Sequence, residues 1–153
     1  MSFLFTLEED RLDEQLISIF EEYEKLVNEA EPLFELEGKR LEVLARNLPY
    51  HQVHYMQKSQ DMKQVVKWLE NYKQKLESRY TKNYLQGQRA LSQRDSVTLI
   101  AGEKEIVELN QLIIEATLIY NKLNDIVEGF RQMGWMLGHV VKLRVASLED
   151  AVI

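Results

Sequence analysis

The sequence predicts an all-α protein: a long antiparallel helical hairpin with N-terminal helices, coiled-coil-like packing and an oligomeric state. Apolar residues recur at helical spacing along most of the 153 residues. Only two prolines and six glycines interrupt the chain, and this scarcity favours long helices. Tyr55, Met62, Leu69 and Leu76 recur every seven residues, which is the spacing of a coiled-coil seam.

The first predicted helix begins near Thr6, where Glu9 completes the spacing of a capping box. Its apolar positions share one face, opposite an almost purely acidic one: Leu12, Leu16, Phe20, Tyr23, Val27 and Ala30. Pro32 is expected to end this helix and to start a short second one that reaches about Asn47. Pro49 then breaks or kinks the chain.

The third helix is predicted from about Tyr50 to Gln86, with Gly87 as its stop. Residues 87–104 form the one real interruption, in which 96–101 (SVTLIA) has the composition of a short strand, an edge segment or an ordered loop, closed by Gly102. The fourth helix is predicted from about Glu103 to Glu149 because its apolar residues alternate at spacings of three and four.

The apolar face of the fourth helix is too wide for one partner helix to cover. A hairpin with the third helix covers part of it, and the remainder predicts self-association. The predicted oligomerisation residues follow the repeat: Leu109, Leu112, Ile119, Leu123, Ile126, Phe130, Leu137 and Val140. Gly134 and Gly138 have a small-xxx-small spacing, which either permits close helix approach or is incidental.

Charge divides the chain into unlike parts. Residues 1–37 hold twelve carboxylates and two basic residues, whereas 38–95 hold twelve Lys and Arg against five carboxylates. Such segregation indicates that the acidic and basic parts meet different partners, or each other. We therefore divide the chain into an acidic N-terminal helical arm, 1–37, and a helical hairpin and oligomerisation domain, 38–153.

The sequence lacks the motifs of the common enzyme classes. It has no P-loop, Rossmann fingerprint or nucleophile elbow, and no cysteine for a thiol-based zinc site. His51 and His54 are three residues apart, but no third ligand is implied nearby, so we expect neither metal nor cofactor. No apolar run is long enough to cross a membrane. We expect a non-enzymatic protein of the cytoplasm with no membrane association.

A basic and aromatic stripe runs along the predicted third helix beside its apolar seam. It comprises Lys67, Trp68, Tyr72, Lys75, Arg79, Lys82 and Arg89. Single-stranded nucleic acid requires this combination, because cations follow the phosphates and aromatic rings stack on unpaired bases. In the alternative interpretation, Trp68 and Tyr72 flank the hydrophobic core and the lysines are merely solvated.

Two stretches of the chain carry a resemblance to a known family. They are Ile126–Arg144, IVEGFRQMGWMLGHVVKLR, and Arg79–Gly87, RYTKNYLQG. The first is similar without gaps to the C-terminal helix of the UvsY family, the recombination mediators of T-even-like phages. The second resembles that family's basic, aromatic-ending helix, which leads into a glycine turn. With two long helices around a loop, the resemblance extends over about residues 38–145.

The resemblance implies an all-helical protein that forms hexameric or heptameric rings and binds single-stranded DNA. It also implies that the protein helps a RecA-like recombinase to displace the single-strand-binding protein in the cytoplasm of a phage host. The family's DNA-contacting basic positions map onto Arg79, with Lys82 beside the second of them.

Two other functions remain open from the sequence. One is a helical structural or adaptor oligomer that does not bind DNA, indicated by the wide apolar stripe and the net charge of −6. The other is an acidic mimic that occupies another protein's DNA groove through residues 8–37. In the mediator interpretation, the acidic arm is expected to compete with DNA for the basic stripe or to dock on a partner's basic surface.

Overall fold

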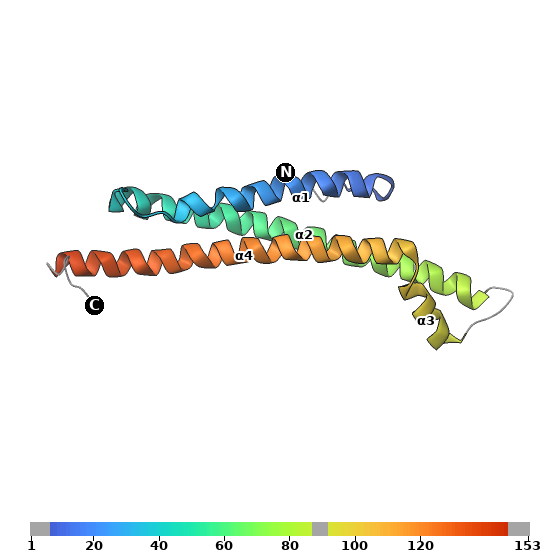
Figure 1. The fold of residues 1–153 in the computed structure, drawn as a ribbon. Helices are drawn as coiled ribbons and strands as arrows, with labels where there is room; N and C mark the ends of the chain where they lie inside the picture. Colours follow the sequence, from blue (N-terminus) through green and yellow to red (C-terminus); the bar gives the residue numbers. More distant parts are fainter. Residues whose placement is uncertain (1–6, 87–91, 147–153) are drawn as a thin grey trace.

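The protein is all-α in the computed structural model, which describes residues 7–86 and 92–146 (Figure 1). Its elements are the 3-10 turn η2 (Glu9–Arg11), α1 (Leu12–Glu29), the 3-10 turn η3 (Glu31–Phe34), α2 (Leu41–Gln86), α3 (Gln93–Ala101) and α4 (Lys104–Val145). The long helices α2 and α4 lie along each other, α1 packs against α4, and α3 contacts both long helices at one end. The predicted all-helical class is confirmed.

Contacts between α2 and α4 occur in opposite order along the two helices. Ser59 Oγ donates a hydrogen bond to Asn124 Oδ1 at 2.5 Å, whereas the later Tyr80 hydroxyl donates to the earlier Glu105 Oε2 at 3.1 Å. The four predicted seam residues of α2 are all buried: Tyr55, Met62, Leu69 and Leu76. The seven-residue repeat therefore identified the side of α2 that packs in the core.

The helix α1 contributes its apolar face to the same core. Five of its side chains are buried there: Leu12, Leu16, Ile19, Phe20 and Tyr23. Two polar contacts add to this packing, because the Tyr55 hydroxyl donates to the Leu26 carbonyl at 3.1 Å and Lys122 Nζ lies 2.8 Å from Glu24 Oε1. The apolar face of the acidic segment is thus docked on the long helices.

The predicted break at Pro49 is wrong, because α2 continues through this residue. Proline has no backbone N–H, so the carbonyl of Ala45 loses its usual helical donor. Both Ala45 and Pro49 are exposed, which leaves that carbonyl accessible to water. Leu48 before the proline packs against the core and Tyr55 after it is buried there, so packing on both sides holds the helix on its course. Pro32 lies in the first turn of η3, but the predicted short helix from Pro32 to about Asn47 is wrong, because η3 ends at Phe34 and α2 begins only at Leu41.

Residues 96–101 do not form a strand or a loop, since they lie in α3. Ser92 caps this helix: its Oγ accepts from the Asp95 backbone N–H at 3.2 Å and donates to Asp95 Oδ2 at 2.5 Å. This reciprocal cap precedes the β-branched run and outweighs its strand propensity. Ser96 and Ile100 are the buried residues of α3, and Gly102 follows its last residue as predicted.

Three predicted boundaries, Thr6, Gly87 and Glu149, lie outside the described residues. Within the described part, the first helical turn begins at Glu9 and α4 ends at Val145.

Several large apolar side chains of α4 remain exposed. They are Val107, Ile114, Leu118, Trp135, Met136, Val141, Leu143 and Val145. None of the helices in the described ranges combines the length and the apolar character that crossing a bilayer requires.

Candidate nucleic-acid interface

The structure separates the predicted basic stripe into exposed cations and partly buried rings. Lys67, Lys75, Arg79 and Lys82 are exposed on α2. Trp68 and Tyr72 are partly buried and pack against the core. Arg89 lies outside the described residues. The stripe is therefore cationic on its surface and aromatic beneath it.

Trp68 and Tyr72 contact each other and pack against the core. The ring centroids of Trp68 and Tyr72 are 5.4 Å apart with an interplanar angle of 33°. Tyr72 also faces charged groups, since burial, Glu9 and Glu105 raise the pKa of its hydroxyl while Arg79 and Lys75 oppose the rise. This placement agrees with the alternative interpretation, in which the two rings flank the core and do not stand open for base stacking.

The exposed side of α2 between residues 56 and 86 is strongly cationic. It presents five basic residues, Lys63, Lys67, Lys75, Arg79 and Lys82, and a single exposed carboxylate, Glu70. Its other exposed polar residues are Gln57, Gln60, Gln64, Asn71, Gln74, Ser78, Asn83 and Gln86. Cations among amide groups can contact phosphates and sugars. We call the five basic residues the cationic face of α2.

Four of the five members of the cationic face form no ion pair among the residues that the structure describes. They are Lys63, Lys67, Arg79 and Lys82, whereas the neighbouring Lys73 pairs with Glu77 at 3.7 Å. Lys63 belongs to this face but was missed by the sequence analysis, which followed the aromatic residues. The four-residue spacing from Lys63 to Lys67 was the available signal, because residues at that spacing share one side of a helix.

Lys75 has a partner from the acidic segment. Its Nζ lies 2.6 Å from Glu9 Oε1, across 66 residues of sequence. Beside this ion pair, a cavity of about 520 Å³ separates the acidic residues 9–14 from Tyr72 and Arg79 on α2. The acidic arm thus lies against the middle of the predicted stripe.

The tyrosines that follow Arg79 point to the beginning of α4. The Tyr80 hydroxyl donates to Glu105, and the Tyr84 hydroxyl forms a short hydrogen bond with Glu103. These hydrogen bonds to carboxylates, together with desolvation, raise the pKa of both tyrosines. The two tyrosines of the Arg79–Gly87 stretch therefore link α2 to α4, and Lys82 remains on the exposed side.

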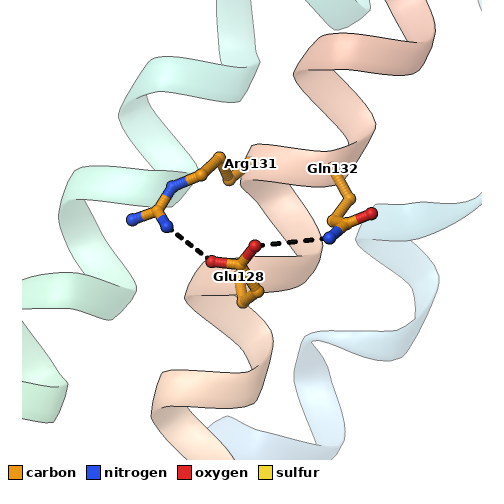
Figure 2. Close-up of polar contacts among 3 residues, drawn as sticks. All are labelled: Glu128, Arg131 and Gln132. Carbon is orange, nitrogen blue, oxygen red and sulfur yellow. Dashed lines mark hydrogen bonds and ion pairs between the residues drawn. The ribbon is translucent and has the colours of Figure 1, made fainter.

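The C-terminal stretch that carries the family resemblance presents a local polar cluster on α4. Figure 2 shows Glu128 between its two partners: Arg131 Nη1 lies 2.6 Å from Glu128 Oε2, and Gln132 Nε2 donates to Glu128 Oε1 at 3.3 Å. Because these residues are three and four positions apart, the contacts are the ordinary pairing of one helix surface. The cluster stabilises α4 locally and leaves Arg131 exposed.

The buried side of the same stretch packs on the N-terminal elements. Phe130 is fully buried and stacks on Phe34 with ring centroids 4.5 Å apart. A Cβ added at Gly129 would lie 2.9 Å from Phe34 Cε1, and one at Gly134 would lie 3.2 Å from Leu48 Cδ2. Nothing in the described residues lies within 4 Å of the corresponding position at Gly138. Close approach within this chain therefore involves Gly129 and Gly134.

Most of the predicted oligomerisation residues are buried within one chain. Leu109, Ile119, Leu123, Phe130 and Leu137 belong to the core, and Leu112 and Ile126 pack against it; Val140 is partly exposed. Packing with α1 and α2 accounts for this burial. A surface for self-association would have to use the exposed apolar residues of α4.

Two of the three histidines, His51 and His54, take part in aromatic packing. The His51 ring stacks on Phe130 with centroids 5.8 Å apart, and the His54 ring lies 6.2 Å from that of Tyr50. In residues 7–86 and 92–146, no three or more His, Cys, Asp or Glu side chains are grouped to hold a metal ion.

The fold and the cationic face define a small all-helical protein whose second helix presents positive charge along one exposed side. Comparisons with known protein families, with curated proteins and with solved structures found no match.

Proposed function

We propose that this protein binds single-stranded DNA through the cationic face of α2 and acts as a recombination mediator. In this role it loads a RecA-like recombinase onto DNA covered by single-strand-binding protein, without catalysing a reaction. The observation that supports the proposal is the imbalance of five exposed cations to one exposed carboxylate between residues 56 and 86. The protein as a whole has a net charge of −6, so positive charge is concentrated on this exposed side of α2.

The proposed contact is mainly with the phosphates. Lys67 and Lys82 are separated by 15 residues, about 22 Å along the helix axis, so several phosphates can be contacted at once. Because Trp68 and Tyr72 are partly buried, base stacking contributes little in this arrangement. Binding is therefore expected to depend steeply on salt and weakly on base sequence.

We further propose that antiparallel pairing of α2 with α4 gives a rod that assembles into a hexameric or heptameric ring. Exposed apolar residues of α4, among them Ile114 and Leu118, support such assembly. A ring would present several cationic faces to one strand, and multivalency would raise the affinity above that of a single face.

Fluorescence anisotropy with a labelled oligonucleotide tests the proposal. The double substitution Lys67→Gln and Lys82→Gln should weaken binding and lower the slope of log K against log salt by about 0.7 for each lysine. The matched control, Lys25→Gln with Lys142→Gln, makes the same change in net charge away from the cationic face. Equal effects of the two pairs, or no binding at low salt by the unsubstituted protein, would contradict the proposal.

A second candidate function is a helical adaptor that assembles and binds proteins without a role in DNA binding. It is favoured by the exposed apolar residues of α4, of which Trp135 is 74% exposed and Ile114 is 61% exposed. Light scattering that shows assembly, together with anisotropy that shows no binding of oligonucleotide, would support this candidate over the first.

A further inference from the structure

We infer that the turn Glu9–Arg11, through Glu9, acts as a built-in competitor that occupies Lys75 in the middle of the cationic face and must be displaced by a polyanion. The inference concerns regulation of the proposed DNA site and rests on that proposed function. It assigns a role to the acidic segment, which lies outside the sequence resemblance.

The contact itself is the ion pair between Glu9 and Lys75. Its 2.6 Å separation brings a carboxylate to the position that a phosphate oxygen would take on the same ammonium group. The two side chains are 40% and 58% exposed, respectively, so the pair is solvated and contributes little to the stability of the fold. An ion pair of this kind can be exchanged for another anion without loss of the core.

The surroundings of the ion pair concentrate negative charge opposite α2. The charged residues that line the cavity beside it are six carboxylates, Glu9, Asp10, Asp13 and Glu14 from the arm and Glu105 and Glu108 from α4, and one cation from the arm, Arg11. Arg79 lines the same cavity from the cationic face. A phosphate chain approaching Lys75 and Arg79 meets this field, so it must displace the arm or be repelled.

The fold separates a fixed part of the arm from a part that can move. The helix α1 is held by its five buried side chains and by the contact of Glu24 with Lys122. Residues 9–11, by contrast, form a single 3-10 turn with no buried side chain. Among the described residues, the start of this turn is held by a hydrogen bond from the Glu8 N–H to Gln15 Oε1 at 2.9 Å, by one from the Arg11 N–H to the Glu8 carbonyl at 3.2 Å and by partial packing of Leu7. The turn can therefore leave α2 while α1 stays docked.

Oligonucleotide binding at low salt tests the competition. Glu9→Gln should tighten binding about two- to fivefold, the range expected for release of one exposed ion pair. Glu21→Gln, which removes an exposed carboxylate elsewhere on α1, is the matched control and should change binding less. In a Lys75→Gln background, Glu9→Gln should have no further effect. Equal gains from Glu9→Gln and Glu21→Gln would overturn the inference, because they would show only an effect of net charge.

Two measurements without DNA test the inference independently of the proposed function. Amine acetylation followed by mass spectrometry should modify Lys75 more slowly than Lys67 in the unsubstituted protein, and Glu9→Gln should remove this difference. On immobilised heparin, Glu9→Gln should elute at higher salt than Glu21→Gln. If no variant binds oligonucleotide, the proposed function fails, and these two results still decide the inference. Equal acetylation of Lys75 and Lys67 before substitution would overturn it.

Discussion

The two sides of α2 differ in burial and in charge. On one side, Met62 and Leu69 are fully buried and packed against other helices. On the other side, Lys67 and Lys82 are exposed and form no ion pair within the described residues. The buried side takes its position from packing, whereas the exposed side presents charge without fixing structure.

This difference separates the residues that hold the fold from those that we propose for function. Truncating a core side chain leaves a cavity that its neighbours fill incompletely, so stability falls. Removing a solvated lysine leaves the packing unchanged and alters only the local charge. The two sides can therefore be tested independently by substitutions two residues apart.

The largest expected effect is on the buried side. Leu69→Ala should lower the free energy of unfolding by about 2–5 kcal/mol, because it removes a fully buried side chain from the seam. Lys67→Ala is the control on the other side and should change stability by no more than about 0.5 kcal/mol. Urea unfolding followed by circular dichroism measures both. A loss for Lys67→Ala that matched that for Leu69→Ala would contradict the assignment of the two sides.

The buried side could be predicted from the sequence because apolar spacing directly reflects burial. The repeat of Tyr55 and Met62 placed the seam correctly, and the apolar positions of α1 predicted the face that docks. The break at Pro49 was wrong because packing on both sides of a proline outweighs one missing hydrogen bond. The strand or loop at 96–101 was wrong because the cap at Ser92 was overlooked.

The candidate interface was predictable only in part. Lysine spacing gave the exposed cations, but nothing in the local pattern showed that Glu9 would lie beside Lys75, 66 residues away. Likewise, Trp68 and Tyr72 have the spacing of a stacking surface, and only the tertiary fold shows that they pack against the core. Such contacts depend on how α1 meets α2, which helical periodicity does not specify.

Two glycines of α4, Gly129 and Gly138, differ in the space that surrounds them. Gly129→Ala would place a methyl group 2.9 Å from the ring of Phe34, which is itself stacked on Phe130. Strain of about 1–3 kcal/mol should exceed the helix-propensity gain of about 1 kcal/mol, so thermal stability should fall. Gly138→Ala meets no described atom within 4 Å and should raise stability by up to about 1 kcal/mol. Stabilisation by both substitutions would show that Phe34 does not occupy the space beside Gly129.

The smallest expected effect concerns the packed face of α1 at alkaline pH. Tyr23 is 1% exposed, and its burial, followed by the charges of Asp61 and Glu22 and a hydrogen bond with Asp61, raises its pKa well above the ordinary value of 10.0. An unfolded chain then releases the proton at lower pH than the folded one. The stability that neutral Tyr23 contributes is therefore complete below pH 10 and is lost progressively above it.

Tyr23→Phe keeps the ring but cannot ionise, so it should make stability less sensitive to alkaline pH. Urea midpoints measured from about pH 8 to about pH 11 should fall more steeply for the unsubstituted protein than for this variant, because unfolded tyrosine ionises in that range. Tyr50→Phe is the matched control, since Tyr50 is 70% exposed. Identical slopes for Tyr23→Phe and the unsubstituted protein would mean that Tyr23 is not held in the core, and that α1 does not dock on the long helices through this residue.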